Sequence, residues 1–202
     1  MIEFSNDIKV RLFNNPETVS AGELEGLLAM IPEWRRRKVL SYRFLIDRVL
    51  CAKAYLLLCE ELRETYNITE LQPFGFEENG KPILSYHPDI HFNLSHCRKG
   101  VLCACSDKPI GCDIEEIPLQ LDLDLCHHVF SEKENEEILA STNPCVSFAI
   151  LWTKKEAYLK LTGEGINDNL PSLFNPTILS EIEFYSNVCQ DNGYVYTVCN
   201  KL

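Results

Sequence analysis

The sequence predicts an α+β protein made of two similar halves, residues 1–108 and residues 109–202. Two observations predict this architecture. The same order of elements, namely a strand, a short capped helix, a long helix and a hairpin, occurs twice along the chain. In addition, no stretch rich in glycine and serine separates the two copies, so we expect the halves to pack tightly together. The copies share no residue-level identity, and the repeat is therefore one of architecture.

The first half contains each element of this order. Alternating apolar residues predict an opening strand at residues 8–13, and the capping box at residues 20–23 begins a short helix. The longest helical pattern covers residues 41–66, and its apolar stripe is wide enough for a largely buried helix. The Asn-Gly pair at residues 79–80 predicts a tight turn, and residues 91–106 form a hairpin pattern.

The second half repeats the order. Residues 110–116 alternate in the two-residue period of a strand, and a second capping box lies at residues 131–134. A second long helical pattern covers residues 146–161, and residues 182–198 predict a final hairpin around an Asp-Asn-Gly turn.

Composition limits the classes of function. The net charge of −11 argues against a general nucleic-acid-binding protein, which would carry a basic surface. The basic run at residues 35–38 instead suggests a small anionic ligand. We find neither a secretory signal nor an apolar run of the roughly 20 residues needed to span a bilayer. The ten cysteines show no CxxC pair, so we expect reduced, mostly buried thiols in a cytoplasmic protein.

Three carboxylates form a candidate metal site. Asp113 and Glu115 lie on one face of the predicted strand, about 7 Å apart along it. Two carboxylates placed in this way repel each other unless a cation lies between them, and hard oxygen ligands suit Mg²⁺. Glu156 lies on a stripe with Trp152 and Lys160 in an otherwise apolar helix and could complete the set. Taken alone, these residues favour a solvated acidic strand and a surface Glu-Lys pair over a metal site.

Five motifs, in order, resemble those of the 4′-phosphopantetheinyl transferase superfamily, in its larger two-halved form that activates peptide and polyketide synthetases. They are Gly80-Lys81-Pro82, Phe92-Asn93-Leu94-Ser95-His96, residues 109–115 (PIGCDIE), residues 130–134 (FSEKE) and residues 152–166 (WTKKEAYLKLTGEGI). The resemblance implies two α+β halves related by pseudo-twofold symmetry, with coenzyme A bound in the cleft between them.

The resemblance also implies roles for individual residues. It implies that Asp113, Glu115 and Glu156 bind Mg²⁺, that Glu156 acts as the base, and that Lys160 stabilises the leaving phosphate. The residues expected to bind coenzyme A are Lys81, Ser95 and His96 near the 3′-phosphate, Lys155 and Lys160 near the pyrophosphate, and Arg37 and Arg48 near the adenine nucleotide. The expected reaction transfers phosphopantetheine to a serine of an apo acyl or peptidyl carrier protein and releases 3′,5′-ADP. We expect a monomer, because the duplication supplies both halves.

Two alternatives stay open at this stage. One is a non-catalytic module that binds carrier proteins or coenzyme A. The other is a Mg²⁺-dependent nuclease, although Lys160 follows Glu156 by four residues and not by the two typical of that arrangement. For His96, a local structural role in the hairpin is as plausible as ligand binding.

Overall fold

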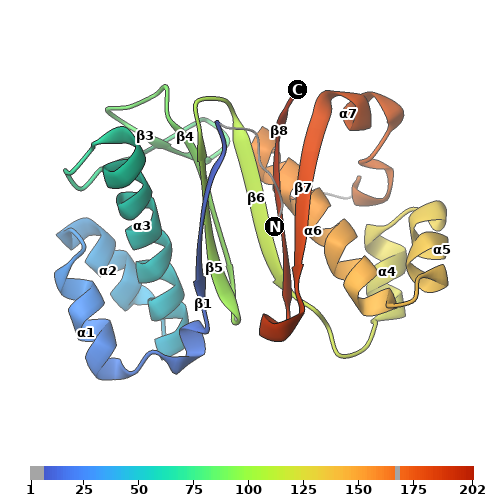
Figure 1. Cartoon of the computed structure of the whole chain (residues 1–202), viewed down its shortest axis with the longest axis horizontal. Coiled ribbons are helices and arrows are strands. Elements are labelled where there is room, and N and C mark those ends of the chain that lie inside the picture. The colour runs from blue at the N-terminus through green and yellow to red at the C-terminus, as the bar shows by residue number, and fades with distance from the viewer. Residues whose placement is uncertain (1–6, 167–168) are drawn as a thin grey trace.

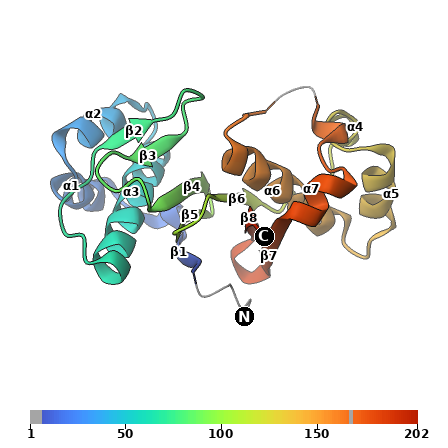
Figure 2. The same ribbon diagram turned by 90° about the horizontal axis from the view of Figure 1, so that it is seen from above.

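The computed structural model describes residues 7–166 and 169–202, and helices cover the outside of a central layer of strands (Figures 1 and 2). The first half comprises β1 (Lys9–Asn14), α1 (Ala21–Ala29), α2 (Glu33–Ser41), α3 (Leu45–Tyr66), β2 (Phe74–Phe76), β3 (Pro82–Leu84), β4 (His91–Cys97) and β5 (Gly100–Ser106). The second half comprises β6 (Ile110–Glu116), α4 (Leu123–Val129), α5 (Glu132–Ala140), α6 (Pro144–Thr162), α7 (Pro176–Glu181), β7 (Ile182–Cys189) and β8 (Tyr194–Lys201). Short 3₁₀ helices lie at Pro16–Thr18, Leu170–Ser172 and Gln190–Asn192.

The two main sheets have the same topology. Their strand orders are β1-β5-β4 and β6-β8-β7, so in each half the last strand is central and the first strand pairs with it. All of these pairings are antiparallel. A small separate hairpin, β2-β3, belongs to the first half. The mixed α+β architecture with two similar halves is therefore confirmed.

The halves share a core between the two sheets. Residues of one face of β6 pack there against β5 and β8, and these include Ile110, Cys112 and Ile114. Two further clusters bury α3 against the first sheet and against α1 and α2. The apolar residues of α6 pack against α4, α5 and the second sheet. Helix, sheet, sheet and helix layers thus follow one another across the molecule (Figure 2).

The structure corrects the first long helix and adds elements that were not predicted. The pattern at residues 41–66 begins as a helix only at Leu45, because the chain is extended at Tyr42 and Phe44. The basic run before it belongs to a separate helix, α2. The short helices α4 and α7 were not predicted. Both predicted capping boxes are present, at Ser20 and at Ser131.

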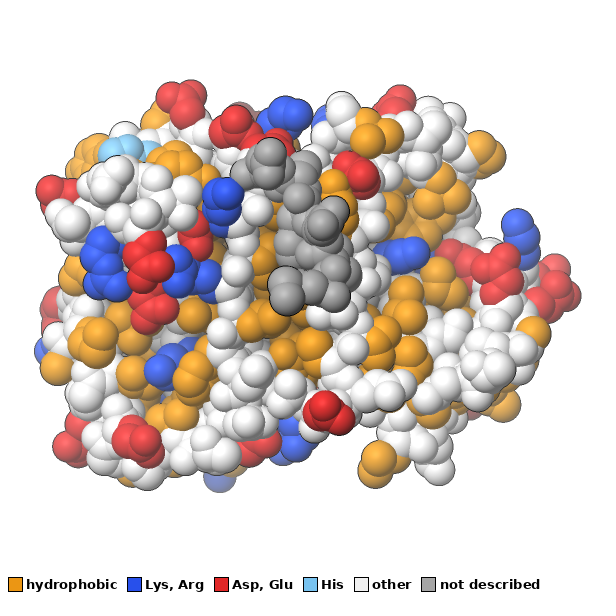
Figure 3. Space-filling model, viewed as in Figure 1, with side chains coloured by type: hydrophobic (Ala, Val, Ile, Leu, Met, Phe, Trp, Pro, Cys, Tyr) orange, Lys and Arg blue, Asp and Glu red, His pale blue; other side chains and the backbone are white. Residues whose placement is uncertain are grey.

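Surface and thiol properties agree with the composition. Acidic and basic side chains are interspersed on the face shown in Figure 3. All ten cysteines are free thiols, and most of them are buried. Among the residues that the structure describes, no helix has the length and apolar character needed to cross a membrane.

Candidate active site

The site is built where α6 lies directly on β6. A Cβ atom on Gly111 of β6 would stand 2.0 Å from the carbonyl oxygen of Ala157 and 2.6 Å from the backbone nitrogen of Leu161. Only glycine therefore permits this close approach of helix and strand. The hydroxyls of Thr153 and Thr197, 2.8 Å apart, tie the same helix to β8. As a result, the side chains of α6 that face β6 lie close to the carboxylates of that strand.

Asp113 is the centre of a buried polar network. Its Oδ1 accepts hydrogen bonds from the hydroxyl of Ser95 at 2.7 Å and from Nζ of Lys160 at 2.5 Å. Lys160 also donates to the Ser95 hydroxyl at 2.8 Å. Burial alone would lower the pKa of Lys160, but the neighbouring acidic groups, Asp113 above all, together outweigh burial and raise it, so the lysine stays charged. The network joins α6 and β6 of the second half to β4 of the first.

The other two predicted metal ligands lie in the electrostatic field of this network. Burial, together with the charge of Asp113, raises the pKa of Glu115 to about 7, whereas Lys160 and the Trp152 indole oppose that shift. Burial also raises the pKa of Glu156, which Lys160 opposes and Asp113 reinforces. A nearby positive charge therefore stabilises the ionised form of each of these carboxylates.

Two carboxylate oxygens at this place are unsatisfied. Oδ2 of Asp113 and Oε1 of Glu156 are buried and have no hydrogen-bond partner within the described part of the chain. Lone buried carboxylate oxygens are costly unless a cation or donor compensates them. The same residues do not form a ready-made cluster, because the described residues contain no group of three ligating side chains close enough to hold a metal. In this arrangement Lys160 neutralises Asp113, and the three carboxylates are oxygen donors of the type that Mg²⁺ takes.

A cavity of about 350 Å³ opens beside these groups, between the two halves. Its lining residues come from the β2-β3 hairpin, from β4 and from the end of α6: Asn79, Gly80, Lys81, Pro82, Asn93, Leu94, Glu156, Leu159, Lys160, Gly163, Gly165 and Ile166. Lys81 donates from Nζ to the carbonyl oxygen of Leu161 at 2.8 Å, and burial lowers its pKa. Lys81 and Lys160 therefore border the same cavity from opposite halves.

A second cavity of about 690 Å³ adjoins the first, because Pro82 and Leu94 line both. Its walls carry Trp34, Arg35 and Lys38 of α2 and the aromatic rings of β2. The guanidinium of Arg35 lies 5.7 Å from the centre of the Phe74 ring, and its Nη2 donates to the carbonyl oxygen of Cys51 at 2.8 Å. We refer to these two neighbouring cavities as the cleft; Arg35 and Lys38 line the larger one, and Lys81, Glu156 and Lys160 line the smaller one.

Two of the predicted basic residues, Arg37 and Arg48, lie outside the two cavities. Arg37 is exposed and pairs with Glu33 at 3.1 Å, and Arg48 donates to the carbonyl oxygen of Tyr42 at 2.9 Å. Neither of them lines the two cavities. Within the basic run, Arg35 and Lys38 line the larger cavity and Arg37 does not. The sequence signal for this pair was the spacing, because Arg35 and Lys38 are three residues apart and share a face of α2.

His96 faces away from its neighbour Ser95, because successive strand residues point to opposite sides. Its side chain is exposed. Desolvation of the ring lowers the pKa of His96, and the nearby charge of Lys160 lowers it further. The His96 ring is thus neutral near pH 7, and it lines neither of the two cavities.

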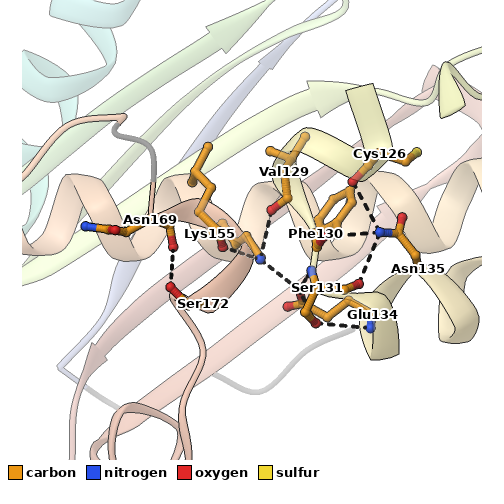
Figure 4. Close-up of polar contacts among 10 residues, drawn as sticks. Cys126, Val129, Phe130, Ser131, Glu134, Asn135, Lys155, Asn169 and Ser172 are labelled. Carbon is orange, nitrogen blue, oxygen red and sulfur yellow. Dashed lines mark hydrogen bonds and ion pairs between the residues drawn. The ribbon is translucent and has the colours of Figure 1, made fainter. Parts of the chain in front are cut away.

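Lys155 does not lie where the resemblance placed it. Its side chain is fully buried on the other side of α6, and Nζ donates to the carbonyl oxygens of Val129 at 3.1 Å and Leu170 at 2.7 Å (Figure 4). Its charge is paired with Glu134 at 2.8 Å, whose carboxylate also closes the capping box of α5. Because α6 turns by about 100° per residue, adjacent Lys155 and Glu156 face different surroundings. The structure therefore holds Lys155 in buried contacts and does not bring it to either cavity, where a pyrophosphate contact was expected.

The fold and the cleft together define a two-halved α+β protein with an acidic and lysine-containing site between the halves. The chain belongs to the 4′-phosphopantetheinyl transferase superfamily, whose family model matches residues 109–199. It is 36% identical over 153 residues to 4′-phosphopantetheinyl transferase psf-1 of Bacillus pumilus, a match that covers 74% of this chain and 65% of that relative. It is 30% identical over 157 residues to a 4′-phosphopantetheinyl transferase of Bacillus subtilis, covering 76% and 70%. It is 33% identical over 166 residues to 4′-phosphopantetheinyl transferase AcpT of Salmonella typhi, covering 77% and 78%.

Proposed function

We propose that this chain transfers the 4′-phosphopantetheine group from coenzyme A to a serine of an apo acyl or peptidyl carrier protein. The observation that carries the proposal is the pair of unpartnered buried oxygens, Asp113 Oδ2 and Glu156 Oε1, beside a cleft in a member of this superfamily. The cleft has the chemistry that such a substrate needs. It offers basic side chains for phosphates, an aromatic wall for a nucleotide base and carboxylates for a metal ion.

We place the nucleotide of coenzyme A in the larger cavity. Arg35 and Lys38 supply positive charge there, and Trp34 and Phe74 supply aromatic surface. Lys81, Ser95 and His96 are proposed to bind near the 3′-phosphate, and Lys160 near the pyrophosphate. Ser95 and Lys160 already share Asp113 as a partner, which fixes their positions before a ligand arrives.

Asp113, Glu115 and Glu156 are proposed to hold Mg²⁺. The donor set fits this ion because it consists of carboxylates, two of which present an unpartnered buried oxygen. Bound there together with the substrate, the ion would neutralise negative charge on the pyrophosphate.

Glu156 is the group proposed to accept the proton of the carrier serine. The serine oxygen forms a bond to the β-phosphorus of coenzyme A, and the bond from that phosphorus to the bridging oxygen of the 3′,5′-ADP portion breaks. Burial raises the pKa of Glu156 and thus makes it a stronger base than a solvated carboxylate. Lys160 stays protonated beside Asp113 and is positioned to stabilise the charge on the departing phosphate.

We further propose that the two halves, divided at residue 108, are related by a pseudo-twofold axis. Their identical strand orders support this proposal. We propose a monomer that works in the cytoplasm, where its free thiols would stay reduced.

The proposal is tested by mass spectrometry of an apo carrier protein incubated with this chain, coenzyme A and Mg²⁺. The expected result is a carrier that gains one phosphopantetheine group, with release of 3′,5′-ADP. Binding of coenzyme A without modification of any apo carrier from fatty-acid, polyketide or peptide synthetases would show a binding module instead.

A further inference from the structure

The β2-β3 hairpin of the first half reaches across to the carboxyl end of α6 in the second half. Nζ of Lys81 donates to the carbonyl oxygen of Leu161 at 2.8 Å, and Nδ2 of Asn79 lies 3.5 Å from that of Thr162. Oδ1 of Asn79 accepts a hydrogen bond from the backbone nitrogen of Lys81 at 3.0 Å. These contacts satisfy carbonyl groups that a helix end leaves without intrahelical partners.

Gly163, at the end of α6, is the residue that the Asn79 side chain packs against. It ends α6 in the left-handed region at φ 77°, and its backbone nitrogen donates to Leu159. A Cβ atom at this position would stand 2.1 Å from Nδ2 and 2.8 Å from Cγ of Asn79. The amide of Asn79 therefore occupies the space that the missing side chain of Gly163 leaves open.

Both partners line the smaller cavity. Asn79, Gly80 and Lys81 form one of its walls, and the segment that begins at Gly163 forms another. The hairpin is not hydrogen-bonded into either main sheet. Phe74 and Leu84 pack the hairpin into the first half, and the contacts of Asn79 and Lys81 join its turn to the end of α6.

We propose that Asn79 and Gly163 form a clasp between the halves that sets the width of the cleft and thereby the affinity for coenzyme A. Asn79 and Gly163 hold the walls that carry Lys81 and Lys160 and take no part in the reaction. The inference rests on the proposed function for the identity of the ligand, but not for the clasp itself.

Gly163→Ala is the direct test, and Gly193→Ala is its matched control. Gly193 also has a positive φ, 72°, and lies in the turn between β7 and β8, where an added Cβ meets no described atom within 4 Å. Both variants carry the left-handed penalty of alanine, but only Gly163→Ala displaces the Asn79 amide. We expect Gly163→Ala to weaken coenzyme A binding roughly 3- to 30-fold in calorimetry. Gly193→Ala should stay within about twofold of the wild type.

Asn79→Ala completes a double-mutant cycle with Gly163→Ala, because it removes every atom of Asn79 that the new Cβ would meet. Alone it should weaken coenzyme A binding by about as much as Gly163→Ala, since both break the same contact. The double variant should bind no worse than either single variant, and kcat at saturating coenzyme A should change less than KM. Multiplicative losses in the double variant, or equal losses in Gly163→Ala and Gly193→Ala, would overturn the clasp.

Hydrogen exchange separates the clasp from the proposed function. The backbone N–H of Lys81 is protected by Asn79, so it should exchange faster in Gly163→Ala than in Gly193→Ala, with or without ligand. Unchanged exchange at Lys81 contradicts the clasp even where the wild-type chain transfers phosphopantetheine. If exchange at Lys81 is faster in Gly163→Ala but the wild-type chain never binds coenzyme A, the clasp is supported and the proposed function is refuted.

Discussion

Two lysines on one helix show how position decides function at the scale of a residue. Lys155 is enclosed by backbone carbonyls and Glu134, whereas Lys160 reaches the buried carboxylate of Asp113. Both were expected at the pyrophosphate, because the sequence shows only that each is a lysine on the same helix. The structure separates them through the direction in which each side chain leaves α6, together with what packs against that side.

Lys155→Met tests the structural role of this residue. The substitution leaves Glu134 without its buried charge partner and removes two bonds to backbone carbonyls, so we expect the free energy of unfolding to fall by about 3 kcal/mol. The affinity of the remaining folded protein for coenzyme A should stay unchanged. Lys154→Met, at the half-buried neighbouring position, is the control and should cost less. Chemical denaturation measures both, and a specific loss of coenzyme A binding in stable Lys155→Met would contradict this assignment.

Glu115 gives the metal-free protein a pH dependence. Its pKa is about 7 in the folded chain against an ordinary value near 4.5, so the folded state holds more protons than the unfolded state between these values. Stability from this group is therefore lost as the pH rises through that window. A bound Mg²⁺ requires the ionised form, so Mg²⁺ binding at pH 6.5 should release protons and should tighten from pH 6 to pH 8.

Calorimetry in two buffers of different ionisation enthalpy measures this proton release directly. Glu115→Gln should bind Mg²⁺ more weakly and release fewer protons. A wild-type protein whose Mg²⁺ affinity is equal at pH 6 and pH 8 would contradict a Glu115 that has a pKa of about 7 and binds the ion.

At the scale of the element, local patterns predicted the strands of the two main sheets, the two capping boxes and both long helices. They failed where an element is short or where an extended residue interrupts a helical pattern. The helices α4 and α7 were missed for the first reason, and the division between α2 and α3 for the second. The contact of Ser95 with Asp113 could not be inferred from spacing, because the two strands lie in different sheets and are brought together only by packing of the halves.

The helix α2 allows a matched comparison of basic residues. Lys38 lines the larger cavity, whereas Arg37, the preceding residue, is exposed and pairs with Glu33. We expect Lys38→Ala to weaken coenzyme A binding by roughly 1 kcal/mol, or about fivefold, and Arg37→Ala to change it little. Isothermal titration at low salt compares the two. A larger loss for Arg37→Ala would place the nucleotide outside the cavity assigned here.

At the scale of the whole molecule, the site depends on both halves. The second half supplies the carboxylates, including Glu156, and Lys160. The first half supplies Ser95, Lys81 and the basic face of α2. The resemblance implied a site between the halves. The doubled order of elements predicted two similar halves, and the identical topology of the two sheets confirms that similarity. The shape of the cleft followed only from the structure. It depends on close contacts at Gly111 and Gly163, where an added side chain would collide with neighbouring atoms.

Cutting the chain after residue 108 should therefore separate two incomplete proteins. Each fragment would expose its share of the core between the sheets, including Leu102 and Ala104 on one side and Ile114 and Tyr196 on the other. We expect neither fragment to be soluble and active alone. A folded fragment of residues 1–108 that binds coenzyme A with wild-type affinity, judged by circular dichroism and calorimetry, would contradict a shared site.

The central claim is that the acidic network in the cleft performs phosphopantetheinyl transfer. Asp113→Asn removes charge from a proposed metal ligand, whereas Glu156→Gln removes both a ligand charge and the proposed base. The most direct measurement is the rate at which each variant modifies an apo carrier protein, followed by mass spectrometry over a range of Mg²⁺ concentrations. We predict that Glu156→Gln still binds coenzyme A but loses about 10²–10⁴ in rate, and that added Mg²⁺ restores Asp113→Asn better than Glu156→Gln. Transfer by Glu156→Gln at the wild-type rate would contradict the account.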